Sequence, residues 1–205
     1  MSRPLTSDEE DHFFSTLTTW LSPSDFKNQY TQAQNVLGYE YMMLMHRAFI
    51  RDAHIACEVA EHFSASKVRL LANDPPDFEI EVDRNIHRFE VTEALNPKRQ
   101  RDKEMRKRLS LDFVEMSESI PNSKIVEENR GAIEAVVDVT TKKFEKYKKR
   151  NLKPNFDLLV YKNVGWSGEE EEKQFFSEIK TRLEEPIQFF PTIWIYNCTG
   201  RIRAI

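Results

Sequence analysis

The sequence predicts a mixed α/β protein in which helices cover a mixed β-sheet. Several segments carry apolar residues at intervals of three and four, which is the spacing of amphipathic helices. Two neighbouring segments near residue 80 alternate apolar and polar residues, as half-buried strands do. Two later runs, 156–164 and 192–198, are almost continuously apolar, which is typical of buried strands. The early strands are joined too tightly for crossovers, so we expect them to pair antiparallel and the later strands to extend the same sheet.

The composition and net charge limit the classes of protein to which this chain can belong. The 205 residues are 40% hydrophobic and 31% charged, which suits a folded globular chain. The net charge of -4 means that a phosphate-bearing partner would have to be met by a local basic patch. No apolar run approaches the roughly 20 residues of a membrane span, and the acidic N-terminus lacks a secretory apolar region, so we expect no membrane partner and a cytoplasmic location. Cys57 and Cys198 have no paired spacing and are expected to be buried thiols of a reducing compartment.

The chain divides at Gly38 into a helical extension and a main domain. Residues 1–38 are predicted to form two helices, the first opening at the capping box Ser7–Glu10. Residues 39–205 are predicted to open with a helix from about Tyr39 to Phe63 and to continue as strands and further helices. The later helices are expected at 105–120, 126–150 and 167–183, with Pro186 and Pro191 after the last of them. The strands are expected at 68–72, 77–82, 88–95, 156–164 and 192–198, with a short edge piece at 202–205.

Two acidic residues occupy the polar positions of the two alternating strands. A two-residue turn at Asp83-Arg84 would place Asp77 opposite Glu90, whereas a turn at Arg84-Asn85 would place Glu79 opposite Glu90. The polar residues share one face in either register. Directly opposed like charges destabilise a sheet, so such acids either face water or hold a cation. Mg²⁺ prefers carboxylate and carbonyl oxygens, which two carboxylates and an intervening main-chain carbonyl would supply.

The stretch from Pro75 to Ala94 resembles the PD-(D/E)xK nuclease superfamily. Pro76-Asp77 matches the PD of that motif, and Glu90-Val91-Thr92 stands where the family has (D/E)-x-K. The resemblance implies a restriction-endonuclease-like αβββαβ core and a Mg²⁺- or Mn²⁺-dependent endonuclease that hydrolyses phosphodiester bonds, in DNA more than in RNA. It implies that Asp77, Glu90 and the carbonyl of Val91 hold the metal, and that a homodimer is one form to expect.

The sequence departs from the family motif at the lysine, which is Thr92 here. Lys98, Lys103 and Lys162 are candidate replacements, as is Gln100 as a polar orienting group, and we take Lys98 as the stand-in. If no such group reaches the site, the alternative is a catalytically inactive module of the same fold that binds nucleic acid or a protein partner.

Two further sets of residues complete the predicted site. The family often has a glutamate on the helix before the first strand, and a helical wheel favours Glu61 over Glu58 for that catalytic role. The segment after the motif strand is strongly basic, and its helix start could face a phosphate. The residues expected to contact nucleic acid are Lys98, Arg99, Arg101 and Lys103.

Overall fold

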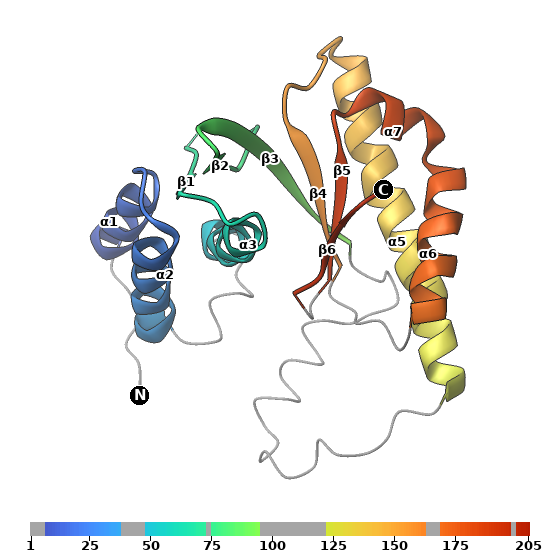
Figure 1. Ribbon diagram of the computed structural model, residues 1–205, viewed down its shortest axis with the longest axis horizontal. Helices are drawn as coiled ribbons and strands as arrows, with labels where there is room; N and C mark the ends of the chain where they lie inside the picture. Colours follow the sequence, from blue (N-terminus) through green and yellow to red (C-terminus); the bar gives the residue numbers. More distant parts are fainter. Residues whose placement is uncertain (1–6, 38–47, 73–74, 95–121, 163–168, 198–199) are drawn as a thin grey trace. The chain divides into compact units, whose positions relative to one another are not determined.

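The computed structural model describes residues 7–37, 48–72, 75–94, 122–162, 169–197 and 200–205 and consists of two compact units (Figure 1). The first comprises Met1–Val91 with Asn155–Leu158, and the second comprises Thr92–Pro154 with Leu159–Ile205. The strands form one six-stranded sheet in the order β1-β2-β3-β4-β5-β6. The predicted α/β class, with helices and one sheet, is confirmed.

The described elements follow the predicted order closely. The first part of the chain contains α1 Ser7–Leu17, α2 Pro23–Leu37, α3 Ala48–His62, β1 Lys67–Leu70, β2 Phe78–Val82 and β3 Asn85–Ala94. The remainder contains α5 Asn122–Lys149, β4 Asp157–Lys162, α6 Glu169–Arg182, α7 Glu184–Phe189, β5 Ile193–Asn197 and β6 Ile202–Ala204. The predicted helix at 105–120 lies outside the described residues, as does the start of the helix expected from Tyr39.

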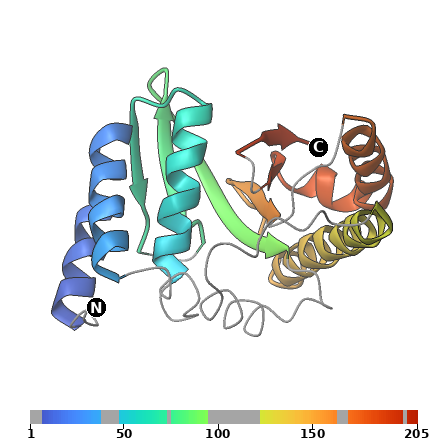
Figure 2. The same cartoon turned by 90° about the horizontal axis from the view of Figure 1, so that it is seen from below.

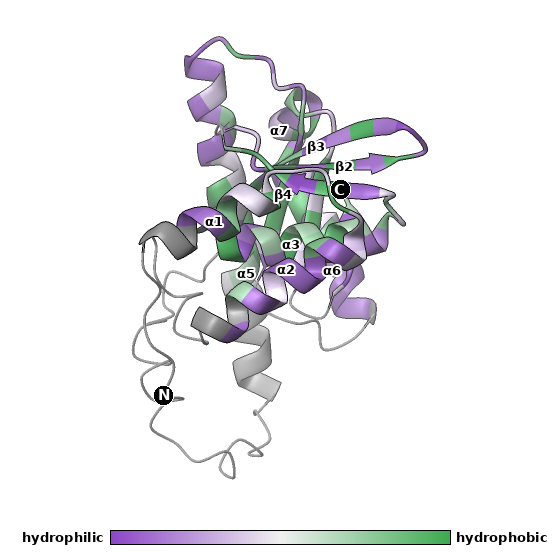
Figure 3. Cartoon of the chain, turned by 90° about the vertical axis from the view of Figure 1, so that its left-hand side faces the viewer, coloured by the Kyte–Doolittle hydropathy of each residue, from purple (hydrophilic) through white to green (hydrophobic). Residues whose placement is uncertain are grey.

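An aromatic stack forms the centre of the first unit. Phe78 of β2 and Phe89 of β3 are opposite each other in the ladder, and their rings stack with centroids 5.0 Å apart. Phe63, just after α3, places its ring 6.1 Å from that of Phe89, and α3 packs along β1 and β2 (Figure 2). Hydrophilic and hydrophobic segments follow one another along β3 (Figure 3), which is the alternation that a strand with one covered face requires.

The β2–β3 hairpin has the first of the two registers considered. Val82 pairs with Asn85, so the turn consists of Asp83 and Arg84 alone. Both turn residues have positive φ, 49° and 65°, as a type I′ turn requires. This turn matches the right-handed twist of the flanking strands and therefore favours the observed register.

The two N-terminal helices belong to the first unit instead of forming a separate extension. α1 packs on α2, and α2 packs on both α3 and β1. Leu21, between α1 and α2, exchanges two main-chain hydrogen bonds with Val68 of β1, at 3.1 and 2.9 Å. The predicted boundary at residue 38 therefore does not coincide with a boundary between compact units.

The second unit has its own aromatic contacts and a buried charge cluster. Phe144 and Tyr147 of α5 make edge-on contacts with rings at the end of α7 and just after it. α6 ends before Pro186, as expected, but a further short helix, α7, was not predicted and contains Pro186 in its first turn. Proline is tolerated in a first helical turn, where its missing N–H has no partner to lose. Glu172 of α6 is buried between Arg201 and Arg203.

The described cysteine fits its expected role. Cys57 is a buried free thiol, and burial raises its pKa to about 12, so the thiol stays protonated near neutral pH. Cys198 lies outside the described residues. Within the described ranges, no helix is long and apolar enough to cross a bilayer.

Replacing Phe89 with alanine should lower the free energy of unfolding by about 3–5 kcal/mol, because it removes one ring of the buried stack and leaves a cavity. Chemical denaturation followed by circular dichroism measures the change. Ile86→Ala, at an exposed position of the same strand, is the matched control and should cost less than about 0.5 kcal/mol. Equal losses in the two variants would contradict the central role of the stack.

Candidate metal site on the second and third strands

Asp77 is bound to the residues on both sides of Glu90. Its main-chain N–H donates to the carbonyl of Phe89 at 2.9 Å. Its carboxylate Oδ2 accepts a hydrogen bond from the N–H of Val91 at 2.6 Å. These bonds place Asp77, the residue before β2, next to Glu90 of β3, which is one of the two registers that the sequence left open.

Glu90 is one of the most deeply buried charged residues of the described chain, with 1% of its surface exposed. Removing a carboxylate from water is costly unless hydrogen bonds or a cation offset the loss of hydration. Asp77 is half-buried beside it, and neighbouring like charges repel. A divalent cation at this position would offset both costs, so the chemistry of the two acids fits a hard metal ion.

The main chain of Val91 adds a third oxygen donor. A strand residue directs its N–H and its C=O toward the same neighbouring strand. The N–H of Val91 points to Asp77, so its carbonyl is directed to that side of β3 as well. The donor set consists of two carboxylates and one carbonyl, the ligand types that Mg²⁺ and Mn²⁺ prefer. Among the described residues, no cluster of three or more His, Cys, Asp or Glu side chains is suited to a metal.

Of the residues predicted to replace the motif lysine, only Lys162 lies within the described part of the chain. Thr92 lies within β3 in the position of the family lysine. Lys98, Gln100 and Lys103 lie outside the described residues, as do Arg99 and Arg101 of the expected nucleic-acid contacts. Lys162 of β4 is buried, and its Nζ lies 4.8 Å from the ring centroid of Phe175 on α6.

Glu61 is not brought to Asp77 and Glu90. It lies near the end of α3, where it forms an ion pair with Lys27 of α2 at 2.5 Å. The chain then reverses into β1, and the N–H of Ser66 bonds to the carbonyl of Glu81. Glu61 is therefore near the Glu81 end of β2, whereas Asp77 lies just before the start of β2, four residues and about 13 Å from Glu81 along the strand direction.

Asp52 is an acid that the sequence analysis missed. It is buried on α3 and accepts hydrogen bonds from the guanidinium of Arg51 at 2.9 and 3.1 Å. The start of α3 lies toward the end of the unit where β1 meets Asp77, because the chain reverses between α3 and β1 (Figure 2). The sequence does contain a signal for this residue, because Asp52 lies one helical turn before Ala56, within the otherwise apolar stripe of the helix.

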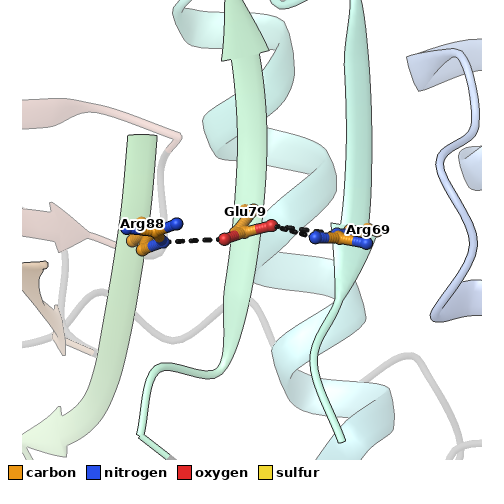
Figure 4. Close-up of polar contacts among 3 residues, drawn as sticks. All are labelled: Arg69, Glu79 and Arg88. Atoms are coloured by element: carbon orange, nitrogen blue, oxygen red, sulfur yellow. Dashed lines mark hydrogen bonds and ion pairs between the residues drawn. The ribbon is translucent and has the colours of Figure 1, made fainter. Parts of the chain in front are cut away.

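Glu79 is a second residue whose surroundings the sequence did not reveal. Arg69 of β1 and Arg88 of β3 flank it across the sheet, at 2.6 and 2.8 Å (Figure 4). Burial acts to raise the pKa of Glu79, but the hydrogen bonds and charges of Arg88 and Arg69 outweigh it, so the pKa of Glu79 lies below its ordinary value of 4.5. Arg69, Glu79 and Arg88 are called the arginine–glutamate row below.

Glu79→Gln should lower the free energy of unfolding by about 1–3 kcal/mol, because it removes the buried, charged acceptor that two arginines share. Folding lowers the pKa of Glu79, so its stabilisation is complete above pH 4.5 and is lost as the pH falls below that value. Denaturation curves of wild type and variant should therefore differ at neutral pH and converge in acid. Glu81→Gln, which loses an exposed ion pair on the same strand, is the control and should show a much smaller loss. A Glu79→Gln difference that grows in acid would contradict this assignment.

Comparisons of the chain with protein-family profiles, with curated proteins and with solved structures found no match.

Proposed function

We propose that the chain is a divalent-metal-dependent nuclease that hydrolyses phosphodiester bonds, in DNA more than in RNA. Asp77, Glu90 and the carbonyl of Val91 are the proposed ligands of Mg²⁺ or Mn²⁺. The observation that carries the proposal is the pair of hydrogen bonds that holds Asp77 beside the deeply buried Glu90.

The order of elements supports the same proposal. Among the described elements, α3, β1, β2, β3, α5 and β4 come in the order helix, three strands, helix, strand. This is the order of the αβββαβ core of the restriction-endonuclease-like fold, which the motif at Pro76-Asp77 and Glu90-Val91 led us to expect. We therefore propose that fold for the core.

The chain's own residues have distinct tasks in this proposal. A bound divalent ion would neutralise charge on the phosphodiester and lower the pKa of an attacking water. Asp77 is oriented by the Val91 N–H, which keeps its carboxylate beside Glu90. Glu90 is held on a paired strand and is screened from water, which strengthens its attraction for a cation. Glu61 is left out of the proposed ligands because its carboxylate pairs with Lys27.

A second candidate function follows from Thr92. Without the family lysine, the same fold and acids would suit a module that binds nucleic acid or a protein partner without cleaving. Lys98 is the proposed replacement, and activity in an otherwise intact chain decides between the two functions. A Lys98→Gln variant that loses cleavage but keeps metal binding would support the replacement, whereas unchanged cleavage would exclude it.

The deciding experiment compares wild type with Asp77→Asn and Glu90→Gln on plasmid DNA and on structured RNA, with Mg²⁺, with Mn²⁺ and with EDTA. We expect wild-type cleavage that requires metal and falls at least about a hundredfold in both variants, since loss of a direct ligand exceeds loss of a supporting group. Glu81→Gln controls for removal of a carboxylate from the same strand. Metal-dependent cleavage that survives in both site variants would refute the assignment. Absence of cleavage together with absence of Mn²⁺ binding by the wild type would refute the nuclease proposal and favour the binding module.

A further inference from the structure

The arginine–glutamate row presents two guanidinium groups on one face of the sheet. Arg69 pairs with Glu79 in the β1–β2 ladder, and Glu79 pairs with Arg88 in the β2–β3 ladder. The Glu79 side chain is only 5% exposed, whereas those of Arg69 and Arg88 are 32% and 41% exposed. One buried negative charge thus holds two accessible positive charges, and the row carries a net charge of about +1.

The hydrogen bonding of the row leaves donors for a ligand. Arg69 uses Nε and Nη2 to bind Glu79 Oε2, at 2.9 and 2.6 Å. Arg88 binds Glu79 Oε1 through Nε alone, at 2.8 Å, in the part of the chain that the structure describes. A guanidinium has five N–H donors in a planar fork that matches two oxygens of a phosphate. The Nη groups of Arg88 are therefore the donors best suited to a bound phosphate.

Trp20 fixes the orientation of Arg69. The guanidinium carbon of Arg69 lies 4.5 Å from the centroid of the Trp20 ring. The next residue, Leu21, is tied to β1 by its two main-chain hydrogen bonds to Val68, which holds Trp20 beside the strand. The bond to Glu79 and the ring contact together hold this guanidinium in place before any ligand arrives, which lowers the entropy cost of binding.

The row lies next to the candidate metal site. Arg88 and Glu90 are two residues apart on β3, so their side chains leave the same face of the strand, about 7 Å apart along it. A phosphate held at Arg88 would therefore lie close to a phosphate bound by a metal ion at Glu90. The chain as a whole is acidic, so a polyanion needs such a local cationic row.

We propose that Arg69 and Arg88 bind a backbone phosphate of a polynucleotide that neighbours the phosphate at the proposed cleavage site. The assignment of this polynucleotide as a substrate rests on the proposed nuclease function, whereas its binding does not. The occupant is a nucleic-acid backbone because the planar forks of the row match two oxygens of a phosphate and the row adjoins the proposed cleavage site.

The test measures binding of fluorescently labelled single-stranded and duplex DNA to the full chain by anisotropy, in EDTA so that nothing is cleaved. We expect Arg88→Gln and Arg69→Gln each to weaken binding about tenfold, and to make the dependence of log affinity on log salt shallower by about one. Arg182→Gln is the matched control, since Arg182 is also about one third exposed and binds Glu134 through two nitrogens. It should bind within about twofold of wild type, because Arg182 is on α6 and is not part of the row.

Thermal unfolding of each variant separates loss of contact from loss of fold. If Arg88→Gln does not fold, the double variant Glu79→Gln/Arg88→Gln replaces it, because removing both partners leaves no buried charge unpaired. That variant keeps the net charge of the row and should still lose affinity about tenfold, since the phosphate contact belongs to Arg88.

The two proposals fail separately. DNA binding by the wild type that both folded arginine variants retain, or no DNA binding by the wild type at all, would overturn the phosphate assignment. Neither result depends on cleavage. Arginine-dependent binding by a chain that never cleaves would support the phosphate assignment while removing the nuclease function.

Discussion

The register of the β2–β3 hairpin is the constraint on which both functional features depend. The turn at Asp83 and Arg84 places Phe78 opposite Phe89. The stacking of these two rings, on a sheet against which α3 packs, stabilises this register. A slip of one residue would put the two rings on opposite faces of the sheet and would turn the acids of one strand toward the core. The observed register leaves Asp77 bound to both neighbours of Glu90 and sets Glu79 between two arginines.

Buried glutamates are held in two ways. In the first unit Glu79 is offset by Arg69 and Arg88, and in the second unit Glu172 is offset by two arginines of the C-terminal segment. Glu90 has a second carboxylate, Asp77, beside it, and the adjacent carbonyl of Val91 is directed to the same side. A cluster of arginines stabilises a fold and can hold a phosphate, whereas a cluster of oxygen donors suits a cation. The two clusters lie next to each other on β3 and have complementary chemistry for a polynucleotide backbone.

Much of the fold could be predicted from the sequence because its signals are local. Alternation at Phe78, Ile80 and Val82 identified a strand, and the turn residues limited the hairpin to two registers. The choice between these registers, and with it the position of Asp77 beside Glu90, depended on the ring stack and was left open. The short helix α7 was not predicted, because Pro186 was read only as the residue after α6, whereas proline is also accepted in a first helical turn.

The errors and omissions in the site have a common physical cause. A helical wheel reports which side of α3 a residue occupies, but not which end of the sheet it approaches, so Glu61 was preferred and Asp52 was overlooked. The partners of Glu79 come from two other strands, and only the assembled ladder brings them together. Local periodicity therefore predicts elements and faces, while the pairing of charges across strands requires the folded sheet.

The most direct measurement is anomalous diffraction from crystals of the full chain grown or soaked with millimolar Mn²⁺. The proposed site predicts a peak bounded by the carboxylates of Asp77 and Glu90 and the carbonyl of Val91, with metal–oxygen distances of roughly 2.0–2.6 Å. A map with Mn²⁺ peaks only elsewhere, or with none while Asp77 still bonds to the Val91 N–H, would contradict the assignment of these acids to a metal.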